Sequence, residues 1–188
     1  MKIIVAVEKN WGIGYENKLL FAVREDMLHF AVRTTGKTVI MGGNTLRSLP
    51  GSAPLKNRFN IVLSRKLADS EISAFKAAGY DIEVARCINE LPSLLDKRDA
   101  DKDGVYIIGG AEVYNELLPF SSEAVVTKFD AAVKADAFFP NLDALGGWTL
   151  YSESPAYEAV DGVSGKTVKY SFCTYINERL ETMRAINV

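Results

Sequence analysis

The sequence predicts an α/β fold with a largely parallel β-sheet. Short runs of β-branched and other apolar residues alternate with segments of helical periodicity over most of the chain, as strand–helix–strand units do. Several runs are apolar at consecutive positions, which is typical of strands that helices cover on both faces. The length of 188 residues fits one domain, and no linker, repeat or low-complexity segment divides it.

The strands and helices follow from these patterns in chain order. The apolar runs that we expect to form strands are residues 3–7, 38–41, 60–63, 105–108 and 124–127. The expected helices are residues 24–35, 44–49, 69–78, 89–97 and 111–118. Pro50, Gly79 and Pro119 follow three of these helices and supply stop signals for them.

The helix at 24–35 and the C-terminal strands show the clearest patterns. At helical spacing, one face of the helix collects Val23, Met27, Phe30, Ala31 and Thr34. Residues 148–154 and 167–176 read as two long strands joined by a turn-rich segment, which predicts an antiparallel hairpin at the sheet edge.

Composition excludes several classes of function. A net charge of −2 offers no broad positive surface for nucleic acid or an anionic membrane. No apolar run approaches the roughly 18–20 residues that span a bilayer, and the N-terminus lacks a signal-peptide cleavage site. We therefore expect a cytoplasmic protein with Cys87 and Cys173 reduced. With His29 as the only histidine and no G-x-S-x-G motif, metal and serine hydrolysis are poor interpretations.

Two segments place a glycine pair between a strand and a helix. They are VIMGGNT at 39–45 and YIIGGAEVY at 106–114. Such a turn is either a close-packing device or a place where a ligand lies against bare backbone, where helix N–H groups favour an anion. Two such turns favour a phosphate-bearing cofactor, although neither matches the G-x-G-x-x-G fingerprint.

Acid–base chemistry points to Asp26 in VREDMLHF. On a helix, Asp26 lies beside the apolar face, near Val23 and Phe30, whereas Glu25, Leu28 and His29 point further out. A carboxylate at the margin of an apolar face is desolvated, which raises its pKa and suits proton transfer. The alternative is an acid in the first turn that stabilises the helix dipole.

An irregular segment, EKNWGIGYENKLLFAV, joins the first strand to that helix. Its glycines and asparagines predict a loop of about a dozen residues that exposes Trp11 and Tyr15. Loops of this length in compact domains are either lids over active sites or plain surface connections.

Together these motifs resemble dihydrofolate reductases. WGIGYENKLLF, an Asp followed four residues on by Phe, VIMGGNT, RFNIVLSR, YIIGGAEVY and ADAFFP occur in that family's order, from residue 1 to about 179. The resemblance implies an eight-stranded, mostly parallel sheet with flanking helices. It also implies hydride transfer from NADPH to dihydrofolate, which gives tetrahydrofolate.

The resemblance implies a substrate site. Asp26 matches the acid that holds the pterin 2-amino group and N3 and promotes protonation at N5 while hydride goes to C6. Thr127 matches the threonine that bridges to that acid through a water. Phe30 matches the aromatic residue against the pterin and benzoyl ring, and Arg58 the arginine that grips the glutamate α-carboxylate. The implied substrate residues are Ile4, Val5, Ala6, Leu19, Asp26, Met27, Phe30, Leu49, Leu55, Arg58, Ile108, Tyr114 and Thr127.

Further roles carry over in the same way. Ile4 and Ile108 would offer backbone carbonyls to the pterin, and Leu49 and Leu55 would line the benzoyl pocket. The implied NADPH residues are Ala6, Ile13, Gly14, Leu19, Gly42, Gly43, Asn44, Thr45, Leu63, Ser64, Arg65, Ile108, Gly109, Gly110, Ala111, Glu112, Val113 and Tyr114. No metal is implied.

Four departures from the family pattern stand out. Leu20 and Phe21 replace the usual Pro-Trp, so the indole N–H that orders active-site water is absent. Gly43 stands where a basic residue often contacts the adenosine phosphates, and Arg65 is a candidate to compensate at the 2′-phosphate. Ala111 replaces a third glycine of the second turn.

Two other functions remain open from the residues alone. One is the riboflavin-pathway pyrimidine reductase of the same fold, and the other is a nucleotide-binding relative without catalysis; the presence of Asp26 disfavours both. We expect a reductase domain over residues 1–179, a tail over 180–188, a monomer, and inhibition by antifolates.

Overall fold

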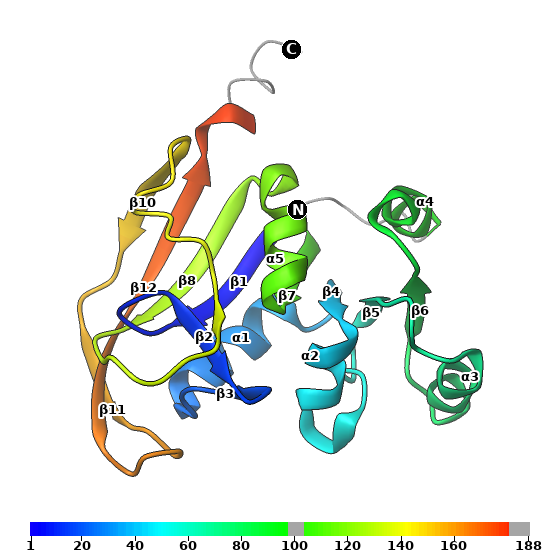
Figure 1. Ribbon diagram of the computed structural model, residues 1–188, viewed down its shortest axis with the longest axis horizontal. Coiled ribbons are helices and arrows are strands. Elements are labelled where there is room, and N and C mark those ends of the chain that lie inside the picture. Colours follow the sequence, from blue (N-terminus) through cyan, green and yellow to red (C-terminus); the bar gives the residue numbers. More distant parts are fainter. Residues whose placement is uncertain (98–103, 181–188) are drawn as a thin grey trace.

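The computed structural model describes residues 1–97 and 104–180. Within these residues one nine-stranded sheet forms the centre of the protein, in the order β10–β12–β8–β1–β7–β4–β5–β6, with β11 also paired to β12 (Figure 1). The strands of this sheet are β1 Lys2–Val7, β4 Thr38–Gly42, β5 Phe59–Leu63, β6 Ile82–Ala85, β7 Val105–Gly109, β8 Glu123–Phe129, β10 Trp148–Glu153, β11 Tyr157–Val160 and β12 Thr167–Asn177.

The strands from β8 to β6 in this order are parallel, which confirms the sheet type that the apolar runs predict. β12 runs antiparallel to β8, to β10 and to β11. Each of the five predicted parallel strands is present within two residues of its expected ends. Their carboxyl ends therefore meet at one edge, which brings the two glycine turns together.

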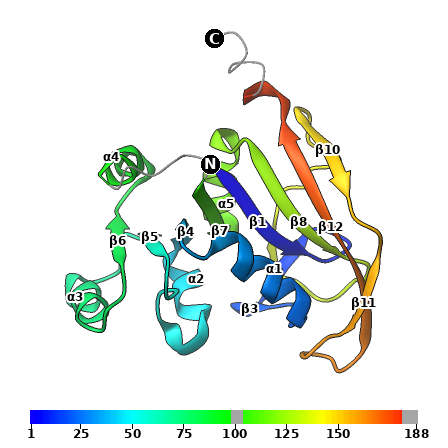
Figure 2. The same cartoon turned by 180° about the vertical axis from the view of Figure 1, so that it is seen from behind.

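Helices cover both faces of the sheet. They are α1 Arg24–Thr34, α2 Gly43–Ser48, α3 Asp69–Ala77, α4 Leu91–Asp96 and α5 Ala111–Leu117, with short 3₁₀ turns at Pro50–Ser52, Ile88–Glu90 and Leu118–Phe120. α5 lies over one face and α1 over the other, as the two opposite views show (Figure 1, Figure 2). All five predicted helices are present within two residues of their expected ends.

The core is divided by the sheet into two layers. Along β1, Ile3 and Val5 face a cluster that includes Val113 and Leu117 of α5, whereas Ile4 faces a cluster that includes Phe30 of α1. This alternation is what a pleated strand covered on both faces requires. It explains why the strand is apolar at every position from Ile3 to Val7.

Three parts of the fold differ from the sequence prediction. β6 is absent from the prediction because its four residues include Glu83 and stand at the sheet edge. The expected C-terminal hairpin is a three-stranded unit, since β11 occupies part of the connection and pairs with the first half of β12. The third difference is the segment after β1.

That segment is not an irregular loop. β2 Gly12–Tyr15 and β3 Lys18–Leu19 form a hairpin, and β9 Ala137–Phe138 pairs with β2. Glu16 and Asn17 both have positive φ angles of 49° and 59°, which is the backbone of a tight two-residue hairpin turn. Such a turn is hard to predict here because neither residue is glycine.

Candidate functional site

Asp26 lies in the first turn of α1, against β8. Burial raises the pKa of its carboxyl above the ordinary value, and a hydrogen bond with the Thr127 hydroxyl opposes that rise without cancelling it. Thr127 is itself buried on β8. The predicted half-buried carboxylate is therefore present, with a specific polar partner from a strand about a hundred residues away in sequence.

The neighbours of Asp26 on α1 differ partly from the prediction. Met27 is 50% exposed, because Val23, Phe30 and Thr34 take the positions against the protein and leave it at the rim. His29, predicted to point outward, packs on the ring of Phe172 with centroids 4.1 Å apart. Burial first, and then the charge of Arg33, lower the pKa of His29 to about 4.

An apolar cluster collects several predicted substrate residues. Phe30, Leu49, Leu55 and Ile108 are partly buried against a core that contains Ile4. They come from α1, from the segment after α2 and from the end of β7, so the fold brings together residues that are far apart in sequence. Their partly exposed rims can contact a flat apolar ligand.

Arg58 stands at the border of this cluster. Its Nε and Nη2 both donate to Thr34 Oγ1 at 3.2 Å, and its Nη1 donates to the Lys56 carbonyl at 2.8 Å. Burial lowers the pKa of its guanidinium somewhat from the usual value, yet the group remains a cation. No ion pair with a carboxylate holds it within the described residues, so its charge is available to an anion.

Asn60 fixes the segment that carries Arg58, and sequence reasoning missed this role. The side chain is fully buried on β5, where its Oδ1 accepts the Leu55 N–H at 2.9 Å. Its Nδ2 donates to the carbonyls of Leu55, Arg58 and Asp81 at 2.9–3.0 Å. The sequence does contain a signal for this role. An amide side chain inside the apolar run FNIVL is expected to be buried, and a buried amide needs hydrogen-bond partners.

The two glycine turns pack against each other. A Cβ on Gly42 would lie 3.2 Å from Val113 Cγ2 and within 3.9 Å of Gly109 O. Gly109 has φ 113° and joins Gly110 through a cis peptide, and a Cβ there would lie 3.1 Å from the Tyr114 ring. Close packing accounts for both glycines, and it also leaves main chain uncovered by side chains at this edge.

Tyr114 is buried beneath the second turn. Its hydroxyl donates to the Ile4 carbonyl at 2.8 Å, and burial raises the pKa of the phenol. Its ring meets Phe139 edge-on with centroids 5.0 Å apart. The Tyr114 hydroxyl therefore holds the Ile4 carbonyl at the end of a buried ring.

The segment between β1 and α1 is held at several points. Trp11, predicted to be exposed, is only 6% exposed and packs against Phe139 and Tyr175. At the β2–β3 turn, the Asp136 carboxylate accepts the Glu16 N–H at 2.9 Å. These contacts explain why the hydrophobic indole is buried although the sequence around it is rich in glycine.

A second anchor lies just before α1. The Asp161 carboxylate, 1% exposed, accepts the Ala22 N–H at 2.8 Å, and Gly162 N donates back to Ala22 O at 3.0 Å. Phe21, beside this anchor, stacks on Phe129 with centroids 4.2 Å apart. Asp161 was missed because its partner is 139 residues away in sequence.

Some predicted site residues lie outside the apolar cluster that contains Ile4 and Phe30. Leu19 is 63% exposed, and Val5 points to the face of the sheet opposite Ile4. Leu63 and Ile13 pack against the α5-side cluster, and Ala6 packs near Phe21. Exposed positions in the predicted cofactor set are Leu19, Asn44, Arg65 and Glu112.

A cavity of about 360 Å³ lies apart from Asp26. It is lined by Trp11, Lys128 and Ser171, and Lys128 points to the opposite face of β8 from Thr127 because neighbouring strand residues alternate. Its charged groups make contacts inside the protein: Lys128 Nζ meets Asp143 Oδ2 at 2.7 Å, and Ser171 Oγ donates to Glu153 Oε1 at 2.8 Å.

Two features are absent from the residues that the structure describes. No group of three or more His, Cys, Asp or Glu side chains is placed to hold a metal ion among residues 1–97 and 104–180. In the same part of the chain no helix is long and apolar enough to cross a membrane.

Comparisons with known proteins match this arrangement to one family. The family model described as dihydrofolate reductase matches residues 1–177. Dihydrofolate reductase of Neisseria gonorrhoeae is 34% identical over 176 residues, covering 94% of this chain and 97% of the relative. The enzymes of Sus scrofa and Mus musculus are 35% and 36% identical, each covering 93% of this chain and 96% of the relative.

Proposed function

This chain belongs to the dihydrofolate reductase family and reduces dihydrofolate to tetrahydrofolate with NADPH, and we propose that Asp26 is the residue that promotes protonation of the substrate. The observation that carries this proposal is the buried Asp26 carboxyl with its raised pKa and its Thr127 partner. A carboxyl of this kind keeps a larger protonated fraction near neutral pH than an exposed one.

The substrate's remaining parts fit the residues around Asp26. We propose that Phe30, Leu49 and Leu55 contact the pterin and benzoyl rings, since these side chains are apolar and only partly buried. Arg58 would bind the α-carboxylate of the glutamate tail. Three of its five N–H groups make contacts inside the protein, which leaves two for a carboxylate.

The polar edge of the pterin needs hydrogen-bond partners as well. An ionised Asp26 accepts from the 2-amino group and N3, and the Thr127 hydroxyl keeps the carboxyl oriented toward them. We propose the Ile4 carbonyl as a further acceptor. Tyr114 holds that carbonyl in place from below.

The residues at the carboxyl edge of the sheet fit NADPH, which supplies the hydride when it is bound. The paired turns Gly42–Gly43 and Gly109–Gly110 present main chain without side chains, so phosphate groups can approach N–H donors. Arg65 is exposed and forms no ion pair with another described residue. We propose that the full set of cofactor residues implied by the resemblance binds NADPH.

Three properties beyond the reaction are also proposed. The enzyme acts as a cytoplasmic monomer, in keeping with its two free cysteines, Cys87 and Cys173, which a reducing compartment preserves. Antifolates of the diaminopyrimidine class bind against Asp26, because their protonated ring matches a carboxylate. One catalytic domain covers residues 1–179; of the proposed tail, residues 181–188 lie outside the described part of the chain.

The test of the proposed site combines turnover with inhibition. Purified protein should oxidise NADPH rapidly when dihydrofolate is added, and a diaminopyrimidine antifolate should stop the reaction. The same inhibitor should bind much more weakly to the Asp26→Asn protein. Equal inhibitor affinity for both proteins would show that Asp26 does not face the ligand.

A further inference from the structure

We propose that Arg47 is a specificity-determining residue for the cofactor, because it supplies the positive charge that a basic side chain at position 43 would otherwise provide. Its ligand would be the phosphate monoester on the adenosine ribose, the group that distinguishes NADPH from NADH. This inference rests on the proposed cofactor site and adds a residue that the family resemblance did not identify.

The geometry of α2 carries the proposal. Gly43 and Arg47 are four residues apart on one helix, so they share a face. A Cβ placed on Gly43 would lie 3.3 Å from Arg47 Nη1 and 3.0 Å from Ser64 Oγ. The Arg47 guanidinium therefore occupies the space into which a side chain at position 43 would extend, beside the Ser64 hydroxyl.

Arg47 reaches that position without a carboxylate partner. Among residues 1–97 and 104–180 its guanidinium forms one hydrogen bond, a long one from Nη1 to Asn44 Oδ1 at 3.5 Å, and none of the ion pairs there includes it. Asp69, the first acid of α3, pairs with Arg86 at 2.7 Å. Arg47 thus presents a positive charge that no carboxylate in the described part of the chain pairs with.

The segment after β5 is built around the same point. Ser64 Oγ accepts the N–H groups of Lys66 and Leu67 at 3.2 Å, so the hydroxyl proton is free to donate to a ligand. Arg86 Nη1 donates to the carbonyls of Ser64 and Leu67 at 3.1 and 2.6 Å, which fixes this turn from behind.

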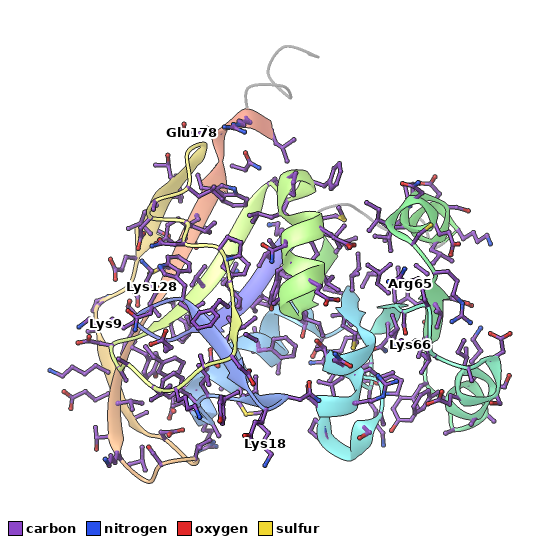
Figure 3. All side chains as sticks on the ribbon, viewed as in Figure 1. Lys9, Lys18, Arg65, Lys66, Lys128 and Glu178 are labelled. Atoms are coloured by element: carbon purple, nitrogen blue, oxygen red, sulfur yellow. The ribbon has the colours of Figure 1, made fainter. Side chains whose placement is uncertain are left out.

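Arg65 and Lys66 add to the positive charge at this turn. Figure 3 shows both side chains at the end of β5, on the part of the molecule that carries α2 and α3. Neither takes part in an ion pair with the described residues. A hydroxyl donor with guanidinium and ammonium groups around it matches a doubly charged phosphate monoester better than a neutral hydroxyl.

The same geometry explains why glycine suits position 43 beside Arg47. A side chain at position 43 would begin only 3.0 Å from Ser64 Oγ, which two backbone N–H groups hold in place. Glycine leaves this space open, and the flexible arginine fills it from the next turn of α2. Arg47 thus places its charge where the charge of a basic residue at position 43 would lie.

The experiment compares ligands with and without the 2′-phosphate. Binding of NADPH, NADH, adenosine 2′,5′-bisphosphate and adenosine 5′-monophosphate is measured by calorimetry for the wild-type protein and for Arg47→Gln. We expect the two 2′-phosphorylated ligands to bind about tenfold or more weakly to the variant. NADH and the monophosphate should bind with unchanged affinity, and Arg47→Lys should keep part of the preference.

Lys169→Gln is the matched control, because it removes one surface charge from β12, far from β5 in the sheet order. Unchanged NADPH affinity in Arg47→Gln, or equal losses for NADPH and NADH, would overturn the proposal. The adenosine bisphosphate reports on Arg47 without turnover. A wild-type protein that binds this ligand but does not reduce dihydrofolate would contradict the proposed function and leave this inference standing.

Discussion

The Asp26 carboxyl of α1 and the Thr127 hydroxyl of β8 form a hydrogen-bonded pair at the junction of the helix and the sheet. Burial raises the pKa of Asp26, and this hydrogen bond lowers it by a smaller amount. The pair thus sets how strongly the carboxyl holds its proton, which is the property that a proton-handling residue in a reductase needs.

Removing the Thr127 hydroxyl should raise the pKa of Asp26 further. Thr127→Val keeps the buried shape but deletes the donor that stabilises the ionised carboxyl. We expect the pH profile of hydride transfer to move to higher pH in this variant. Thr174→Val, which removes a hydroxyl from the neighbouring strand β12, serves as the control. A profile that does not move in Thr127→Val would separate Thr127 from the chemistry.

Asp26 should also reduce the stability of the ligand-free protein at neutral pH. Its pKa in the folded state is above the ordinary value of 3.8, so between these two values the folded protein binds more protons than the unfolded chain. Stability therefore falls as pH rises through that window. Asp26→Asn removes the penalty, and its free energy of unfolding in urea should exceed that of the wild type at neutral pH.

This gain should disappear below pH 3.8, where Asp26 is protonated in both states. Glu25→Gln is the control, since Glu25 lies in the same helical turn but is exposed. An Asp26→Asn protein that is less stable than the wild type at neutral pH would mean that the buried carboxylate is stabilised by contacts stronger than its desolvation cost.

Arg58 should matter for the substrate's tail and not for its pterin. Arg58→Leu should raise the KM for dihydrofolate about tenfold or more, because a carboxylate loses a charge-assisted pair. NADPH affinity should stay the same. Lys56→Leu removes a neighbouring exposed charge and should change little.

A truncated substrate sharpens this test. A dihydropterin without the benzoylglutamate tail should be reduced equally well by the wild type and by Arg58→Leu. If the variant is equally impaired toward both substrates, Arg58 supports the fold of the site rather than binding the tail.

Asp161 should stabilise the connection into α1. Its carboxylate accepts hydrogen bonds from Ala22 N at 2.8 Å and from Ser164 N at 2.9 Å. Asp161→Asn places an amide among these donors, and we expect a loss of about 1–3 kcal/mol in the free energy of unfolding. Asp130→Asn, which removes one partner of the exposed pair with Lys9, should cost at most about 1 kcal/mol.

The effect of Asp161 should depend on pH with a sign opposite to that of Asp26. Burial alone would raise its pKa, but hydrogen bonds from Ser164, Ala22 and Val163 outweigh this and lower it. Its contribution is therefore present above the unfolded value of 3.8 and is lost as pH falls through the folded value. The difference between wild type and Asp161→Asn should narrow in acid; a constant difference would contradict this account.

The sequence was sufficient for the parts of the fold that local patterns encode. Consecutive apolar residues predicted β1 and β7, because a strand covered on both faces has no polar side. The edge strand β6 was missed, since a four-residue strand that includes Glu83 lacks a run of consecutive apolar residues. The β2–β3 hairpin was missed because its turn contains no glycine. Glu16 and Asn17 adopt the positive φ angles instead.

The site was predictable only where a residue's chemistry showed in its own neighbourhood. Asp26 stood out as an acid beside an apolar helix face, and the structure confirms its burial. Asp161 and Arg47 did not stand out, because the first acts across 139 residues and the second by the reach of its side chain into space left by a glycine. Trp11 was predicted to be exposed because partners such as Tyr175 come from a distant strand.

The most direct test of the central claim is the single-turnover rate of hydride transfer from NADPH to dihydrofolate in Asp26→Asn, measured across pH. We predict a rate about 10²–10⁴-fold below that of the wild type at neutral pH, with unchanged NADPH affinity. The rate should recover as pH falls and solvent protons replace the missing carboxyl. A near-normal rate at neutral pH with an unchanged pH profile would contradict the assignment of Asp26 as the proton-handling residue.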